Sequence, residues 1–73
     1  MNLFIEVKDQ ISKNKIALNV FFISSVDECS EGCIVGLING NRYDINEKYD
    51  CFLSRLEEKI NSVIDLREND VFD

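Results

Sequence analysis

The hydrophobic periodicity of this chain changes once, near Asn46, and this change constrains the fold more than any other feature. Before Asn46, apolar and polar residues alternate, as in the stretch LFIEVK at residues 3–8, which is typical of half-buried strands. After it, apolar residues recur at helical spacing from Tyr49 to Ile64. The sequence therefore predicts an α+β domain. It consists of an antiparallel sheet of four to five short strands with one C-terminal α-helix packed on one face.

The strand region divides at its polar interruptions. We expect a first strand over residues 3–7, a second over residues 16–22, and a turn or bulge near Phe21 to Ser24 before a third strand that ends at Glu28. Asn39-Gly40 is the strongest short hairpin signal, because both central residues of a type I′ turn need positive φ. The sequence therefore predicts a two-residue hairpin between strands over residues 33–38 and 41–45.

This hairpin assignment fixes which side chains face the core. It places Ile38 opposite Asn41, and it puts Ile34 and Gly36 on the same face as Tyr43 and Ile45. The predicted core is Leu3, Ile5, Val7, Ile16, Leu18, Val20, Ile34, Ile38, Tyr43, Ile45, Phe52, Leu53, Leu56 and Ile60.

The helix is expected over about residues 47–66. Asn46 is a suitable N-cap, and Glu47 and Asp50 place acids in the first turn, where the helix dipole favours negative charge. Residues 67–73 are acidic around Val71 and Phe72, so we expect a tail there. The expected organisation is a single domain over residues 1–66 followed by an acidic C-terminal tail over residues 67–73.

The segment DECSEGC at residues 27–33 holds two of the three cysteines. Glu31-Gly32 can supply a bend between two apolar runs, so we interpret the segment as a tight β connection. A disulfide between Cys29 and Cys33 is conceivable but not required. A zinc site normally needs four ligands, and the chain has no histidine, so we expect neither a metal nor a cofactor.

The charge distribution points to a protein partner rather than to nucleic acid. The net charge is −6, and residues 44–73 carry nine acids against four basic residues. Phosphate binding needs clustered Lys and Arg, so we expect no direct nucleic-acid binding but a partner with a basic surface. The acids assigned to this partner-binding face are Glu47, Asp50, Glu57, Glu58, Asp65 and Glu68.

The chain lacks the usual marks of an enzyme or a membrane protein. Without histidine, catalysis would need a tuned carboxylate pair, a lysine base or a reactive thiol, and no arrangement of that kind stands out. No run of eighteen apolar residues and no basic-then-apolar start occurs. We therefore expect a non-enzymatic protein of the host-cell cytosol that does not bind membranes.

The predicted second face of the sheet is unusually apolar. Val35 and Leu37 lie on it in the predicted register, and Phe21 opposes its neighbours in the second strand. A single helix covers one face only, so either strand curvature buries these residues or they form a partner or homodimer surface.

The order LFIEV, IALNVFFISSV and GCIVGLINGNRYDINEKYDCFLSRLEEKI resembles the small flagellar and swarming-motility proteins FlbD and SwrD, over about residues 3–60. Similar short proteins occur in phages and other mobile elements. Size and acidic charge are also similar to those of anti-CRISPR proteins. Two hypotheses follow: an inhibitor or regulator of phage or mobile-element type that binds a nucleic-acid-handling complex, or a structural, motility-associated accessory that acts through self-association or an apolar face.

Overall fold

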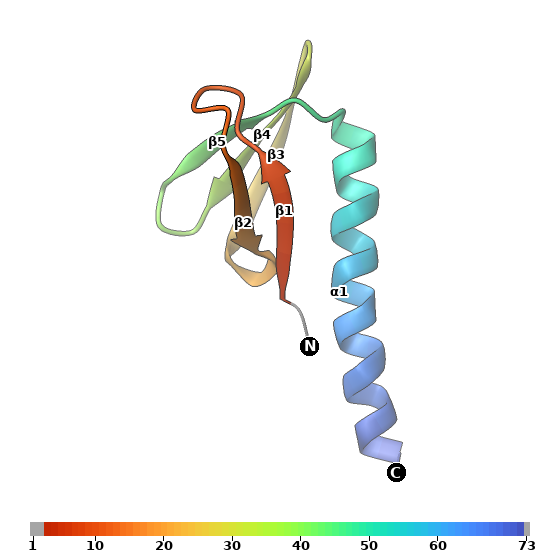
Figure 1. The fold of residues 1–73 in the computed structure, drawn as a ribbon. Coiled ribbons are helices and arrows are strands. Elements are labelled where there is room, and N and C mark those ends of the chain that lie inside the picture. Colours follow the sequence, from red (N-terminus) through yellow and green to blue (C-terminus); the bar gives the residue numbers. More distant parts are fainter. Residues whose placement is uncertain (1–2, 73) are drawn as a thin grey trace.

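Five short strands and one long helix make up the fold in a computed structural model (Figure 1). The structure describes the backbone of residues 3–72 and the side chains of residues 3–64. The elements in chain order are β1 (Phe4–Lys8), β2 (Lys15–Asn19), the 3-10 helix η1 (Val20–Phe22), β3 (Ile23–Cys29), β4 (Gly32–Leu37), β5 (Arg42–Ile45) and α1 (Tyr49–Phe72). The predicted α+β class, antiparallel strands and C-terminal helix are confirmed.

The strands form two sheets rather than one. β1 pairs with β2, and β3, β4 and β5 form a second antiparallel sheet in that order. η1 turns the chain from the first sheet into the second, with the Asn19 side chain accepting a hydrogen bond from the Phe21 N–H at 2.9 Å. A register shift between Ile23 and Ser25 follows. The turn or bulge predicted near Phe21 to Ser24 is therefore present.

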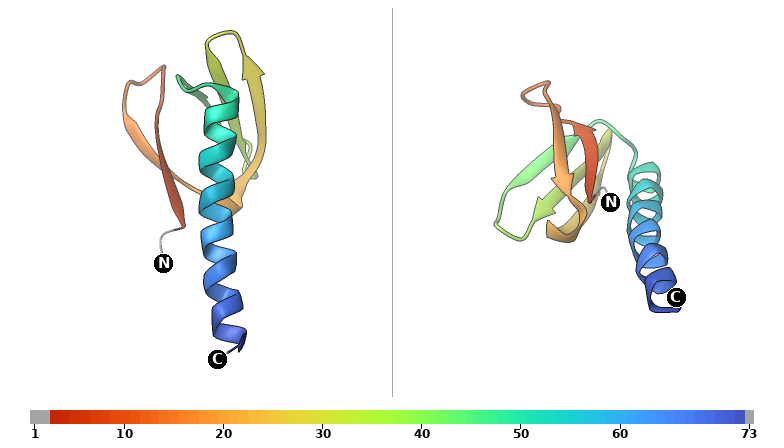
Figure 2. Two further views of the ribbon diagram at one scale, coloured as in Figure 1. Left: turned by 90° about the vertical axis from the view of Figure 1, so that its right-hand side faces the viewer. Right: turned by 60° about the horizontal axis from the view of Figure 1, so that its bottom comes forward.

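The core lies between the two sheets and α1. Phe52 from α1 and Val35 from β4 have no exposed surface, and inward side chains of β1, β2 and β5 surround them. The buried cluster is Ile5, Val7, Leu18, Val20, Cys33, Val35, Ile45 and Phe52. Figure 2 shows α1 running alongside both sheets, and its C-terminal part extends past them.

The hairpin between β4 and β5 differs from the prediction. Gly40 N–H donates to the Leu37 carbonyl and Leu37 N–H donates to the Asn41 carbonyl, both at 2.9 Å, so residues 38–40 form a three-residue loop. Gly40 has φ of +93°, as expected for the left-handed position that closes such a loop. The Asn39 side chain accepts a hydrogen bond from Asn41 N–H at 3.0 Å, which holds the loop.

This loop shifts the register by one residue and exchanges the two faces of β4. Val35 pairs with Tyr43 and Ile34 pairs with Asp44, whereas the predicted pairs were Gly36 with Tyr43 and Ile34 with Ile45. A one-residue slip moves every side chain of a strand to the opposite face. The placement of Ile38 in the core was therefore wrong, because Ile38 is 66% exposed.

The bounds of α1 also differ from the prediction. The Lys48 carbonyl accepts the first helical hydrogen bond, from Phe52 N–H at 2.9 Å, so Lys48 rather than Asn46 holds the N-cap position. The helix continues to Phe72, through most of the segment expected as an acidic tail.

Candidate interaction surfaces

The DECSEGC segment forms a tight β connection, as predicted. Cys29 pairs with Gly32 across the turn made by Ser30 and Glu31. Cys33 pairs instead with Glu28, so the side chains of Cys29 and Cys33 lie on opposite faces of the hairpin. Cys29 is exposed and Cys33 is buried, and both are free thiols, as is Cys51.

The environment of Cys33 suppresses its reactivity. Burial raises the pKa of the Cys33 thiol above its ordinary value, and the nearby Glu47, Cys29 and Asp44 add to this effect. A thiol of raised pKa is a poor nucleophile at neutral pH. Among residues 3–64, no group of three or more His, Cys, Asp or Glu side chains is arranged to hold a metal.

The outer side of α1 is acidic. Asp50, Glu57 and Glu58 are exposed, and helical geometry places them on the side opposite the buried Phe52. Within residues 49–64, the basic residues of α1 are Arg55 and Lys59, and both border hollows lined by β1 residues. The outer side of this part of α1 therefore carries exposed negative charge, with Glu58 at its border beside Arg55 and Lys59.

Glu47 is only partly exposed and is paired with Arg55 of α1. Its carboxylate accepts hydrogen bonds from Arg55 Nε at 2.9 Å and from Arg55 Nη2 at 3.0 Å. The same Nη2 donates to the Glu6 carbonyl of β1 at 2.8 Å. This arrangement connects the start of α1 to β1. The Glu47 carboxylate is neutralised by Arg55 within the chain. The predicted partner-binding residues Asp65 and Glu68 lie outside the residues whose side chains are described.

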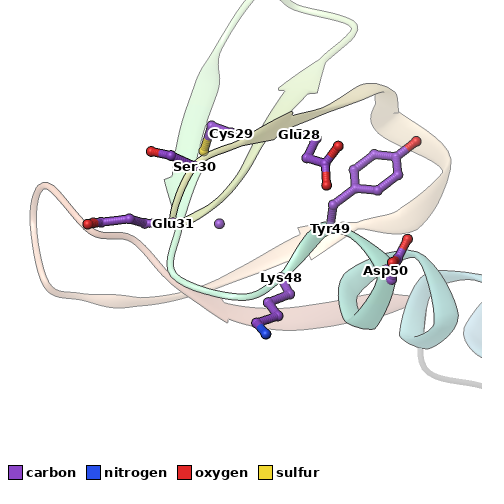
Figure 3. A pocket seen from close by; sticks show the side chains of 8 residues that line it. Glu28, Cys29, Ser30, Glu31, Lys48, Tyr49 and Asp50 are labelled. Atoms are coloured by element: carbon purple, nitrogen blue, oxygen red, sulfur yellow. The ribbon is translucent and has the colours of Figure 1, made fainter.

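Two further acids, at the β3–β4 turn, lie beside the acidic outer side of α1. Glu28 and Glu31 line a shallow hollow together with Lys48, Tyr49 and Asp50 at the start of α1 (Figure 3). The sequence places Glu28 and Glu31 within one acidic segment, but only the fold shows that this segment lies beside α1. We call Glu28, Glu31, Asp50, Glu57 and Glu58 the acidic surface.

The predicted apolar surface is only partly present. Val35 is fully buried, so its assignment to a partner-binding face was wrong: packing of the two sheets covers it, as the self-burial alternative supposed. Leu37 is half-buried against the core. Phe21, by contrast, is 51% exposed on η1.

Phe22 and Ile38 extend the exposed apolar area beyond Phe21. Phe22 lies next to Phe21 in η1, and its carbonyl accepts a hydrogen bond from Ile38 N–H at 2.9 Å. Phe22 and Ile38 are both more than half exposed. We call Phe21, Phe22 and Ile38 the apolar end. Ile38 was not predicted on this surface, because the predicted register placed it in the core.

Comparisons with protein-family models, curated proteins and solved structures found no match to this chain. The class of protein is therefore defined by its fold, a small two-sheet α+β domain. The resemblance to flagellar proteins remains an interpretation of the residues quoted above. Within the described residues, none of the helices has the length and apolar character needed to cross a bilayer.

Proposed function

We propose that this chain is a non-enzymatic inhibitor or regulator of phage or mobile-element type, and that its acidic surface docks on a basic surface of a nucleic-acid-handling complex, as anti-CRISPR proteins do. The observation that carries the proposal is the outer side of α1, where Asp50, Glu57 and Glu58 are exposed and belong to no ion pair among residues 3–64. Glu28 and Glu31 extend the same charge from the β3–β4 turn.

The physical basis is charge complementarity. Opposite potentials steer two proteins together and raise the association rate, and like charges exclude wrong partners. A basic groove that holds nucleic acid is complementary to a row of carboxylates at the spacing of helix turns. A protein that occupies such a groove prevents nucleic acid from binding there without catalysing a reaction, so this action needs no cofactor. The proposed place of action is the host cytosol.

The test combines capture with competition. The tagged chain is used to recover a binding protein from host lysate, and the recovered protein is purified. Its affinity for this chain and for its own nucleic acid is then measured. We expect the chain to displace nucleic acid, and we expect its affinity to fall when salt rises from 0.1 M to 1 M, where the Debye length drops from about 10 Å to about 3 Å.

A charge-neutralising variant makes the test specific. Glu57→Gln with Glu58→Gln keeps side-chain size and should weaken partner binding at least several-fold, while the stability of the fold changes by less than about 1 kcal/mol. Glu57→Asp with Glu58→Asp is the matched control and should retain binding. Binding that is indifferent to salt and to neutralisation would overturn the proposal.

A second candidate function is that of a structural accessory, including a motility-associated one, that contacts itself or a larger assembly through the apolar end. The joined Phe22 and Ile38 favour it, because exposed aromatic and aliphatic groups held in fixed positions are typical of interface centres. Phe22→Ser with Ile38→Ser should abolish such association at high salt. A chain that stays monomeric at every concentration in high salt excludes the self-association form.

A further inference from the structure

Uncharged stretches of the sequence meet around η1. We call four of these stretches the uncharged runs: residues 3–5, 16–26, 32–41 and 60–64. Val20 N–H in η1 donates to the Leu3 carbonyl at 2.9 Å, and the bond between Ile38 N–H and the Phe22 carbonyl joins the β4–β5 loop to η1. α1 also contacts η1. Segments that are far apart along the chain therefore form a common surface at this end of the molecule.

The exposed apolar side chains are concentrated in the uncharged runs. Among residues 3–64, the exposed large apolar side chains are Phe4, Ile11, Phe21, Phe22, Ile38 and Ile64. All of them except Ile11 belong to an uncharged run. Exposed apolar groups together with a scarcity of charge are typical of the centre of a protein interface.

Most of the charge lies towards the opposite end of the strands. Figure 1 and Figure 2 show the β1–β2 turn, the β3–β4 turn and the start of α1 at one end, and η1 at the other. Arg42, which follows the β4–β5 loop, is paired with Asp27 at 3.1 Å. In α1, Lys59 precedes the last uncharged run, and Asp65 follows it where the helix extends past the sheets. The surface around η1 is therefore bordered by charges but contains none.

This charge distribution indicates which molecule the surface fits. Two copies of a chain of net charge −6 repel each other where their charged surfaces meet. A two-fold contact brings the same surface of both copies together, so an uncharged surface permits it without like-charge pairs. Asn39 and Asn41 are exposed beside Ile38, and amide side chains both donate and accept hydrogen bonds. The polar rim of the apolar end is therefore complementary to itself.

The exposed apolar area agrees with a reversible dimer. Phe21, Phe22 and Ile38 are each more than half exposed. Large apolar side chains have roughly 150–250 Å² of surface, so these three present roughly 300 Å² per copy. Two copies would then bury roughly 600 Å² of apolar surface, which is the apolar share of an interface near the lower limit of about 1,000 Å². An interface of this size favours reversible association over a permanent dimer.

We propose that two copies of this chain form a two-fold dimer in which the apolar end of each packs against the apolar end of the other. This inference rests on the apolar end of the second candidate function and names the occupant that it leaves open. The acidic surface lies on the β3–β4 turn and the outer side of α1, so the dimer presents it twice.

The experiment follows the oligomeric state of the full chain by sedimentation velocity over a range of protein concentrations. The wild-type mass should rise with concentration to twice the monomer mass and no further. Association should be tighter in 1 M than in 0.1 M salt, because the Debye length falls from about 10 Å to about 3 Å and the repulsion between two acidic chains is screened. Association that weakens as salt rises would contradict an apolar contact.

Two aspartate substitutions separate the apolar end from the general effect of added charge. Ile38→Asp places a carboxylate in the proposed contact and should weaken dimerisation at least about tenfold. Ile11→Asp is the matched control, because it makes the same change at an even more exposed residue of the β1–β2 turn, and it should dimerise like the wild type. Phe21→Ser tests the contact from η1 without adding charge and should also weaken dimerisation. Circular dichroism should show all three variants folded like the wild type.

A mixture tests whether the contact is two-fold. Labelled Ile38→Asp is sedimented with an excess of unlabelled wild type, and it should remain monomeric because both halves of a two-fold contact use the same surface. If the apolar end bound a different surface, the wild type would still capture the variant. A wild type that is monomeric throughout in 1 M salt, an Ile38→Asp variant that dimerises normally, or capture of the labelled variant would each overturn the proposal.

The same variants keep this inference separate from the proposed inhibitor function. Dimerisation is measured on the chain alone, so its outcome does not depend on a basic partner. Ile38→Asp retains the acidic surface and should bind a basic partner protein with wild-type affinity per site. Glu57→Gln with Glu58→Gln retains the apolar end and should dimerise at least as tightly as the wild type. A wild type that dimerises but binds no basic partner would count against the inhibitor function alone.

Discussion

Asp9 and Ile45 form the antiparallel bridge that joins the two sheets. Beside it, Gln10 N–H donates to the Asp44 carbonyl at 2.7 Å. The Asp9 carboxylate accepts a hydrogen bond from Ser12 N–H at 3.0 Å, which fixes the β1–β2 turn next to the bridge. One residue therefore orders the first hairpin and connects it to the second sheet.

The Asp9 carboxylate should make stability depend on pH. Hydrogen bonds from the Ser12 side chain and then from the Ser12 backbone hold the pKa of Asp9 below its ordinary 3.8. A depressed folded-state pKa gives stability that is present above the unfolded-state pKa and is lost as pH falls through the folded-state pKa. In urea unfolding, Asp9→Asn should be less stable than wild type at neutral pH, and the difference should shrink below pH 3.8. A difference that is constant across this range would contradict the assignment.

Gly32 should not tolerate a side chain. A Cβ at residue 32 would collide with the backbone carbonyl oxygen of Ile45, and backbone cannot move aside as a flexible side chain can. Gly32→Ala should lower the free energy of unfolding by about 1–3 kcal/mol. The control is Ser30→Ala in the same turn, which is exposed and should change stability by less than about 0.5 kcal/mol. Equal effects of the two substitutions would argue against the close approach of β4 and β5.

The register of β4 can be tested with two nearby apolar residues. Val35→Ala removes fully buried methyl groups and should cost about 2 kcal/mol. Ile38→Thr acts on a side chain that is 66% exposed and should cost under about 0.5 kcal/mol. Chemical denaturation of both variants measures the contrast. The two-residue hairpin predicted from the sequence requires the opposite order of effects.

The three thiols should react at different rates. Cys29 and Cys51 are exposed, whereas Cys33 is buried and has a raised pKa. A maleimide should therefore modify two cysteines under native conditions and the third only after unfolding, as peptide mapping by mass spectrometry would show. Cys33→Ser should destabilise the fold, while Cys29→Ser should leave it nearly unchanged. Rapid native labelling of Cys33 would contradict its place in the core.

The fold class followed from periodicity, but the faces of β4 did not. The alternation in residues 3–8 correctly placed Ile5 and Val7 inside. In residues 33–38, apolar residues occupy both phases of the alternation, so only the turn could decide the register. Asn39-Gly40 favours a two-residue turn in isolation. The Asn39 side-chain bond to Asn41 and the left-handed Gly40 stabilise the longer loop instead.

The division into two sheets also could not be predicted from the sequence pattern. It depends on η1 and on the bridge from Asp9 to Ile45, and these residues are far apart along the chain. For the same reason the sequence identified Asp50, Glu57 and Glu58 as acidic but could not add Glu28 and Glu31 to the same surface. The meeting of the uncharged runs around η1 likewise appears only once the fold is known.

The fully buried Phe52 has a consequence for the order of events during synthesis. Phe52 belongs to α1, the last element, so strands that have already left the ribosome lack the ring that completes their core. At about 5–20 residues per second, residues 46–64 take on the order of one to four seconds to follow Ile45. The inner faces of the strands can therefore be fully buried only after α1 has been synthesised and has packed against them.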